Sequence, residues 1–171
     1  MNGIEVALGL GSNLGDRLDY LRQARNAIRC LPQVTLLASA PLYETDPVDV
    51  PVEHADLTFY NSVILIGTEL DAHTLYALLA NVETQLGRAR RAGTRNTART
   101  IDIDLLYYDG QTIRSGRLVV PHPRLHVRRF VLQPLCDLRP KLLLPGQCHN
   151  VAHLLAQLSD ASSVKRIMTQ W

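Results

Sequence analysis

The sequence has few of the features that mark secreted, membrane or disulfide-rich proteins. Its three cysteines, Cys30, Cys136 and Cys148, lie far apart and include no C-x-x-C pair, which is typical of free thiols in a reducing compartment. No apolar run reaches the roughly 18 residues that a membrane-spanning helix needs. The amino terminus has no basic region ahead of its apolar stretch, so it does not read as a signal peptide. We therefore expect a cytoplasmic protein with no membrane partner, in which Cys30 and Cys136 belong to the core.

Several signatures of known enzyme classes are also absent. There is no G-x-x-x-x-G-K-[ST] loop and no G-x-G-x-x-G fingerprint, and Gly9-x-Gly11 is too short a match to count. No serine or cysteine stands in a nucleophile-elbow context. The histidines and cysteines offer no credible set of four ligands for a structural zinc ion. These absences argue against a P-loop, a dinucleotide fold, a hydrolytic triad and a zinc module.

The composition is that of an ordinary globular protein. The chain has 171 residues, of which 46% are apolar and 20% charged, and its net charge is +2. Because about 150 residues is a common domain size, we expect residues 1–171 to form one domain. So small a net charge gives no support for a nucleic-acid partner. We also expect the protein to be a monomer.

Hydrophobic periodicity predicts an α+β fold. Continuous or alternating apolar runs indicate strands, and apolar residues spaced by three and four indicate helices. The predicted elements are a strand at 4–10, a helix at 14–31, a strand at 34–43 that Pro41 breaks or places at an edge, a loop at 44–56, a strand at 58–66, a helix at 71–86 and a strand at 101–107. This βαββαβ order is typical of the ferredoxin-like fold, an antiparallel sheet with helices on one face.

Local signals refine these boundaries. We expect a turn at 11–13, a helix cap at Asp71, a helix stop at Gly87 and a hairpin turn at Asp109-Gly110. A short strand pair should follow, and then additional C-terminal helices near 125–135 and 150–158.

The most informative stretch is Ile101-Asp102-Ile103-Asp104-Leu105. Successive side chains of a strand point to opposite faces, so Asp102 and Asp104 share one face, with Cα atoms roughly 6.5–7 Å apart. Carboxylates at this spacing can bind one or two divalent cations, and Mg²⁺ prefers one or two carboxylates together with phosphate oxygens. Taken alone, the pattern also fits a half-exposed strand with acids on its wet side.

The preceding loop favours the metal-binding interpretation. Five of the twelve residues at 88–99 are arginine and none is acidic: Arg88, Arg90, Arg91, Arg95 and Arg99. Guanidinium groups beside a metal site suit a polyphosphate, whose charge both can share. Phosphoryl transfer needs little beyond positioning and charge neutralisation. A nucleic-acid ligand is less favoured because the loop has no interleaved aromatic residues.

Two further groups could contact a ligand. Phe59 and Asn61 open the third predicted strand, and an aromatic ring with a nearby amide can stack on and hydrogen-bond a flat heterocycle. Without other signs of a ligand, they would be the start of a strand with a core aromatic. His122 follows Pro121 in a loop and could donate a hydrogen bond to a phosphate, although a lone loop histidine is more often simply exposed.

A set of short motifs runs in order along the chain: Ala7-Leu8-Gly9-Leu10-Gly11-Ser12-Asn13-Leu14, Tyr43-Glu44-Thr45, Phe59-Tyr60-Asn61, Leu86-Gly87-Arg88-x-Arg90, Arg99-Thr100-Ile101-Asp102-Ile103-Asp104 and Val120-Pro121-His122. In sequence and approximate spacing they resemble the 6-hydroxymethyl-7,8-dihydropterin pyrophosphokinase family of folate biosynthesis. The resemblance covers essentially the whole chain. It implies transfer of the β,γ-pyrophosphate of ATP to the hydroxymethyl oxygen of the pterin, with release of AMP.

The resemblance also implies roles for individual residues. Asp102 and Asp104 match the ligands of two Mg²⁺ ions, and Arg88 and Arg99 match the loop arginines that act on the phosphates. The implied ATP-binding residues are Glu83, Arg88, Arg90, Arg95, Arg99, Arg117, His122 and Arg128. The implied pterin-binding residues are Thr45, Pro47, Phe59, Asn61 and Phe130.

The chain departs from the family pattern at several positions. Asn96 stands where an aromatic residue is usual and Ala98 where proline is usual, Pro123 replaces a frequent tyrosine, and Val48-Asp49 lacks a common glycine. None of these changes removes a metal ligand. Two alternatives stay open: a degenerate paralogue that binds Mg-ATP without pterin turnover, and a module that binds phosphate or RNA through the arginine loop.

Overall fold

The computed structural model describes residues 3–48, 57–87, 99–159 and 162–171. Its elements, in chain order, are β1 (Ile4–Ser12), α1 (Arg17–Arg29), β2 (Val34–Ser39), β3 (Leu42–Thr45), β4 (Phe59–Thr68), α2 (Ala72–Gln85), β5 (Asp102–Tyr108), β6 (Ile113–Ser115), β7 (Leu118–Val120), the 3₁₀ helix η2 (Leu125–Val127), α3 (Arg129–Leu138), α4 (Val151–Gln157) and β8 (Val164–Met168). No helix among the described residues is long and apolar enough to cross a membrane.

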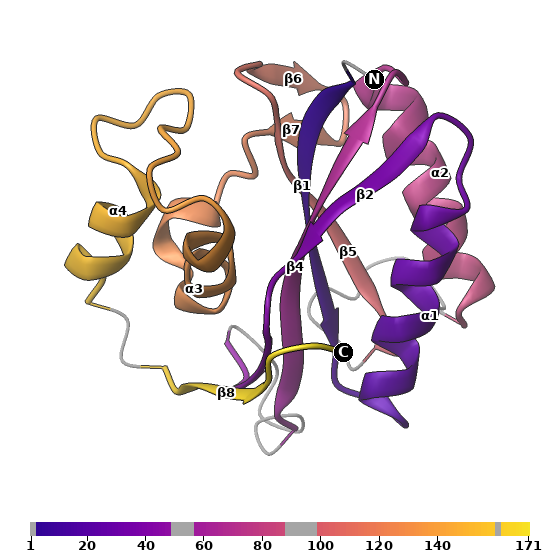
Figure 1. Ribbon diagram of the computed structural model, residues 1–171, viewed down its shortest axis with the longest axis horizontal. Helices are drawn as coiled ribbons and strands as arrows, with labels where there is room; N and C mark the ends of the chain where they lie inside the picture. Colours follow the sequence, from indigo (N-terminus) through magenta and orange to yellow (C-terminus); the bar gives the residue numbers. More distant parts are fainter. Residues whose placement is uncertain (1–2, 49–56, 88–98, 160–161) are drawn as a thin grey trace.

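The main sheet is antiparallel, and its strand order is β5-β1-β4-β3-β8, with β2 also paired to β4 (Figure 1). The predicted second strand is divided into β2 and β3 on either side of Ala40 and Pro41, and both parts pair with β4. The βαββαβ order and the α+β ferredoxin-like class are therefore confirmed.

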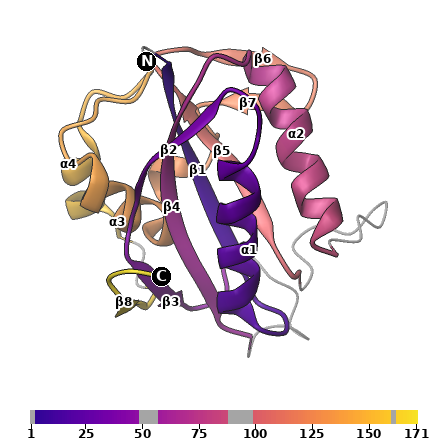
Figure 2. The same cartoon turned by 45° about the vertical axis from the view of Figure 1, so that its right-hand side comes forward.

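The two helices of the βαββαβ core share one face of the sheet, as expected, and the additional C-terminal helices cover the opposite face. One core cluster joins the sheet to α1 and α2 through residues such as Leu21, Ile28 and Leu75. A second cluster joins the opposite face to α3 and α4 through residues such as Leu132 and Val151. Figures 1 and 2 show these two pairs of helices on opposite sides of the sheet.

The ends of the first two helices follow from local chemistry. Asp16 caps α1 by accepting a hydrogen bond from the Asp19 amide at 3.0 Å, and Asp71 caps α2 as predicted. Gly87 follows the last residues of α2 with φ of +83°, a conformation that favours glycine. The predicted turn at 11–13 begins too early, because β1 continues through Ser12.

The later part of the chain departs more from expectation. The β6-β7 pair is confirmed, but Asp109 and Gly110 do not link two paired strands, since β5 pairs with β1 and β6 with β7. The helix expected near 125–135 is a 3₁₀ turn followed by α3, and α4 is capped by Asn150. Strand β8 was not predicted. Cys30 is exposed, so its expected place in the core is wrong, whereas Cys136 is half-buried and packs against the second core cluster.

Candidate active site

The two aspartates of β5 lie on one face of the sheet, as the alternation predicts. Asp102 and Asp104 are half-buried and line a pocket of about 180 Å³. Ile101, Ile103 and Leu105 lie on the opposite face, in the core beneath α1 and α2. The apolar face of the strand thus holds the two carboxylates toward the pocket.

Two glycines of β1 form the floor between the carboxylates and the rest of the pocket. In the β1–β5 register, Gly11 lies opposite Asp102 and Gly9 opposite Asp104, and both glycines line the pocket. On its other side Gly11 pairs with Asn61 of β4. A Cβ on Gly11 would lie 2.7 Å from Asn61 Oδ1. The missing side chain therefore leaves open the space between Asp102 and Asn61.

Asn61 is held in one orientation by Thr45. Its Nδ2 donates to Thr45 Oγ1 at 2.7 Å, and both residues are buried. With Nδ2 engaged in this way, Oδ1 faces the space above Gly11, where it can accept a hydrogen bond from a ligand. Phe59 and Phe130 also line the pocket, so the amide and two aromatic rings surround the same space.

Arg99 is placed by the residue that follows β1. Its amide donates to Asn13 Oδ1 at 2.7 Å, and the Asn13 amide donates to the Arg99 carbonyl at 3.2 Å. The Arg99 guanidinium then forms an ion pair with Asp102, with Nη1 and Oδ2 2.6 Å apart. The segment before β5 is thus fixed to the end of β1, with one cation beside the carboxylate pair.

His122 presents a neutral donor to the same pocket. Its backbone amide donates to the Leu106 carbonyl at 2.8 Å, and its Nδ1 accepts from the Arg124 amide at 3.3 Å. Burial, and secondarily the charges of Arg128 and Arg124, lower the pKa of His122 to about 4. The imidazole is therefore neutral at pH 7, with its proton on Nε2.

Glu83 does not lie among the residues that line the pocket. It is buried, and its Oε1 accepts a hydrogen bond from the backbone amide of Ile103 at 2.8 Å. Because β5 is an edge strand, this carboxylate satisfies an amide that no neighbouring strand reaches. Glu83 thus supports the strand between Asp102 and Asp104, and the ATP contact that the resemblance implies for it stays a prediction.

The other residues named from the sequence fall into three groups. The pocket brings together Thr45, Phe59, Asn61, Arg99, Asp102, Asp104, His122, Arg128 and Phe130. Pro47 and Arg117 are not among its lining residues, although Asp46 and Val48 beside Pro47 are, and Arg117 is exposed next to β7. Arg88, Arg90 and Arg95 lie outside the described residues.

Sequence reasoning missed several pocket residues. Gly9 and Gly11 were set aside as a partial dinucleotide motif, yet two glycines two apart on a strand share one face and open it. Asp46 and Arg124 also line the pocket. Their only signal was proximity in the chain to Thr45 and His122.

The donor set is compatible with Mg²⁺. Among the described residues no group of three or more histidine, cysteine, aspartate or glutamate side chains could hold a metal ion. Two carboxylates on one face nevertheless match the preference of Mg²⁺ for one or two protein carboxylates completed by phosphate oxygens and water. Asp102 and Asp104 are thus the residues that could hold such an ion.

Comparison with known proteins identifies the family. Residues 7–140 match the model of the 7,8-dihydro-6-hydroxymethylpterin-pyrophosphokinase family. The chain belongs to this family. It is 39% identical over 138 residues to the 2-amino-4-hydroxy-6-hydroxymethyldihydropteridine pyrophosphokinase of Bacillus subtilis, covering 81% of this chain and 79% of that protein. The enzyme of the same name from Methylorubrum extorquens is 36% identical over 160 residues, covering 94% and 96%.

Solved structures support the fold. A crystal structure of Plasmodium falciparum HPPK-DHPS superimposes with a TM-score of 0.71 at 15% identity, covering 90% of this chain. This chain spans 42% of that larger protein. At such low identity the likeness bears on the fold alone.

Proposed function

We propose that the chain carries out the reaction of its family by transferring the β,γ-pyrophosphate of ATP to the hydroxymethyl group of 6-hydroxymethyl-7,8-dihydropterin, which releases AMP. Membership of the family makes the chain a pterin pyrophosphokinase that uses ATP. One observation carries the assignment of the site. On one side of Gly11 the pocket holds the carboxylates of Asp102 and Asp104 beside the Arg99 guanidinium. On the other side it holds the Asn61 amide together with the aromatic rings of Phe59 and Phe130.

On the triphosphate side, Asp102 and Asp104 would hold two Mg²⁺ ions. When bound, Mg²⁺ neutralises phosphate charge and lowers the pKa of the acceptor hydroxyl. The number of ions rests on the resemblance and on the paired carboxylates. The position of Asp102 and Asp104 on one face of β5 supports two ions, because two adjacent carboxylates can share their oxygens between two cations.

The positively charged and neutral donors of this chain act on the phosphates directly. Arg99, beside Asp102, places a guanidinium where negative charge accumulates during transfer. His122 is neutral, so its Nε2–H donates a hydrogen bond without adding charge. Arg128 lines the same pocket. The roles of Arg88, Arg90, Arg95, Arg117 and Glu83 as further ATP contacts remain predictions.

On the heterocycle side, the residues of this chain orient the acceptor. Phe59 and Phe130 can stack on the two faces of the pterin, while Asn61, fixed by Thr45, accepts from its ring N–H groups. Pro47 would shape the backbone of the same wall. The open floor at Gly11 lets the bound pterin extend toward the carboxylates, which supports transfer between the two halves.

The test is AMP release from ATP and Mg²⁺ with and without 6-hydroxymethyl-7,8-dihydropterin. We expect pterin-dependent AMP with no ADP. Nucleotide binding that requires Mg²⁺ but gives no AMP would instead indicate the degenerate paralogue. Phosphate or RNA binding that is independent of Mg²⁺ and weakens steeply with salt would indicate the binding module.

The remaining expectations concern the whole chain. We propose a cytoplasmic monomer of one domain, residues 1–171, without a nucleic-acid or membrane partner. Sedimentation velocity at micromolar concentration tests the monomer directly.

A further inference from the structure

The heterocycle half of the pocket has two walls from different layers of the molecule. Thr45 and Asn61 belong to β3 and β4, whereas Phe130 stands near the start of α3. A flat ring can be held between these walls only if the distance from the sheet to α3 is fixed. Apolar packing that includes the pocket residues Val63 and Val131 contributes to this distance, and polar contacts outside the pocket contribute as well.

Tyr43 and Asp137 connect the two walls. The Tyr43 hydroxyl donates to Asp137 of α3. Tyr43 is the register partner of Asn61 and stands two residues before Thr45, so it lies on the same face of the sheet. Asp137 follows Phe130 by seven residues, about two helical turns, and so lies on the same side of α3. The contact therefore joins the strand that orients Asn61 to the helix face that carries Phe130.

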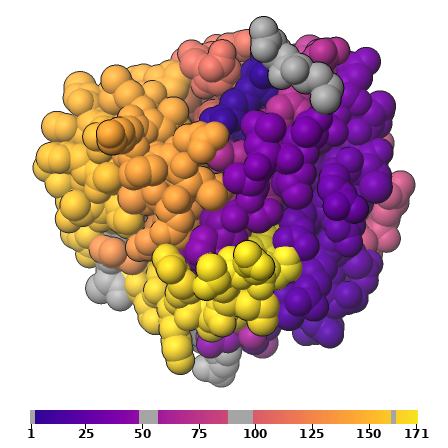
Figure 3. Space-filling view, in the orientation of Figure 1, coloured from indigo at the N-terminus to yellow at the C-terminus, as the bar shows by residue number. Residues whose placement is uncertain are grey.

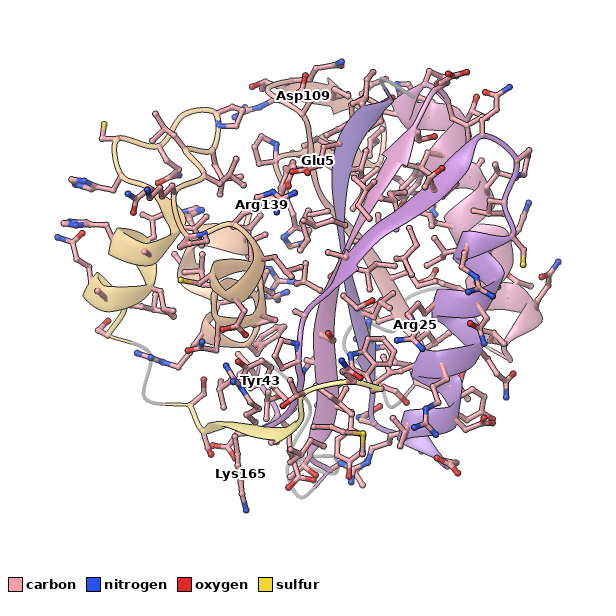
Figure 4. The ribbon with its side chains drawn as sticks, viewed as in Figure 1. Glu5, Arg25, Tyr43, Asp109, Arg139 and Lys165 are labelled. Atoms are coloured by element: carbon pink, nitrogen blue, oxygen red, sulfur yellow. The ribbon has the colours of Figure 1, made fainter. Side chains whose placement is uncertain are left out.

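Arg166 of β8 completes this contact. Its Nε and Nη2 donate to the Tyr43 hydroxyl oxygen at 3.3 and 3.2 Å, and Nη2 also donates to Asp137 Oδ1 at 3.3 Å. The Arg166 side chain is 51% exposed and that of Asp137 19%, while Tyr43 is buried. Figure 4 shows Tyr43 between α3 and β8.

Strand β8 also holds the end of β3 at the rim of the pocket. Val164 pairs with Thr45, the Asp46 amide donates to the Ser163 carbonyl at 3.2 Å, and the Ser163 amide donates to Asp46 Oδ2 at 2.8 Å. Asp46 itself lines the pocket. At the other end of β3, Trp171 Nε1 donates to the Ala40 carbonyl at 2.9 Å. The C-terminal segment thus brackets β3, and Figure 3 shows it on the surface beside the α3–α4 layer.

We propose that β8, through Arg166, is a positioning element that sets the width of the heterocycle pocket. None of the described residues that line the pocket belongs to β8, so its effect on binding is indirect. Calling the ligand a pterin rests on the proposed function. The positioning itself rests only on the contacts among β8, β3 and α3.

The test compares Arg166→Ala with Lys165→Ala. Lys165 is the adjacent residue of β8, is exposed and forms no side-chain hydrogen bond or ion pair with the described residues, so its variant removes equal charge from the same strand. We expect Arg166→Ala to raise the KM for the pterin roughly tenfold, since charge-assisted hydrogen bonds to two partners are lost. The KM for ATP and kcat should stay within about twofold, because the triphosphate side is untouched, and Lys165→Ala should match the wild type.

Two further variants separate positioning from general weakening. Arg166→Lys, which keeps the positive charge but replaces the planar guanidinium by an ammonium group, should recover part of the pterin affinity. Tyr43→Phe should raise the pterin KM in the same direction, and Arg166→Ala should add little in that background, because both changes disrupt one network. Equal increases in both KM values, or additive effects of the two substitutions, would overturn the proposal.

A readout without ligand distinguishes this proposal from the proposed function. Amide hydrogen exchange at Thr45 and Asp46 should be faster in Arg166→Ala than in Lys165→Ala. Faster exchange in a protein whose wild type shows no pterin-dependent AMP release would uphold the positioning role and reject the pterin assignment. Unchanged exchange and an unchanged pterin KM would reject the positioning role.

Discussion

At the scale of single residues, the site depends on charges that the register of β1 and β5 brings together. Asp102 and Asp104 face the pocket, Arg99 is paired with Asp102, and His122 adds a neutral donor. These groups differ in charge, so substitutions at each of them should have different effects on activity and stability.

Removing either carboxylate should stop the reaction without unfolding the protein. We expect Asp102→Ala and Asp104→Ala each to lower kcat by roughly a thousandfold or more, since the loss of bound Mg²⁺ removes several kcal/mol of charge stabilisation. Both side chains are half-buried at the pocket, so the core is unaffected. Steady-state AMP release and thermal melts measure the two effects, with exposed Glu69→Ala as control. Near-normal turnover at saturating Mg²⁺ would show that the metal ligands are wrongly assigned.

His122 should titrate well below an ordinary histidine. Its pKa is lowered from 6.5 to about 4. Between these values the unfolded chain binds a proton that the folded one does not, so the stabilisation is complete above pH 6.5 and is lost as pH falls toward 4. It amounts to at most about 3 kcal/mol, and less after solvent screening. NMR titration should give the pKa directly, and His122→Gln should flatten the stability profile in that range. A measured pKa near 6.5 would show that the half-buried position of His122 does not disfavour its charged form.

At the scale of elements, the pocket depends on two glycines of β1, Gly9 and Gly11, which leave space between the side chains of β4 and β5. Gly11 lies between Asp102 and Asn61 in the two registers of β1. The backbone of a central strand cannot move aside for a new atom without disturbing both partners, so the strain should fall on the nearest side chain.

Gly11→Ala should therefore weaken pterin binding. The new Cβ would lie 2.7 Å from Asn61 Oδ1 and displace the amide, and overpacking of this kind costs about 1–3 kcal/mol, enough to raise the pterin KM roughly tenfold or more. Gly67→Ala on β4 is the matched control, because its Cβ would make an ordinary contact with Leu37 at 3.6 Å. An unchanged pterin KM in a folded Gly11→Ala protein would show that Asn61 does not form a hydrogen bond that contributes to pterin binding.

The elements also differ in how well the sequence predicts them. Strand β5 was predictable because aspartate and apolar residues alternate over its first four positions, and α2 because Asp71 and Gly87 mark its ends. Strand β8 was not, because it is short, three of its five residues are exposed, and its partner β3 lies more than 100 residues away in the chain. Cross-strand neighbours such as Gly11 and Asn61 depend on register, which periodicity alone does not determine.

The sequence of β1 did indicate that both of its faces are covered. Val6, Ala7 and Leu8 are consecutive and completely buried. A continuous apolar run indicates a strand covered on both faces, and this agrees with helices on both sides of the sheet. The sequence did not predict which helices cover which face of the sheet, because the apolar side of a helix can pack against either face.

At the scale of the whole molecule, two polar contacts near the C-terminal end of α3 tie the α3–α4 layer to the sheet. One tie is the contact among Tyr43, Asp137 and Arg166. The other is Glu5 of β1, which accepts from Arg139 at 2.6 and 3.1 Å and from the Tyr107 hydroxyl at 2.6 Å (Figure 4). Because Phe130 reaches the pocket from this layer, the docking of the layer matters for stability and for the site.

The tie at Glu5 should make stability depend on pH in a defined direction. Burial alone would raise the pKa of Glu5, but hydrogen bonds from Arg139 and Tyr107 outweigh it and hold that pKa below 4.5. The stabilisation is therefore present above about pH 4.5 and is lost as pH falls through the folded pKa. With Glu5 30% and Arg139 41% exposed, we expect Glu5→Gln to lower the free energy of unfolding by about 1 kcal/mol at pH 7. Urea denaturation should show this difference shrinking at pH 3, while the exposed control Glu69→Gln shows none at either pH. A difference of the same size at both values would mean that packing around Glu5, and not its charge, holds the α3–α4 layer to the sheet.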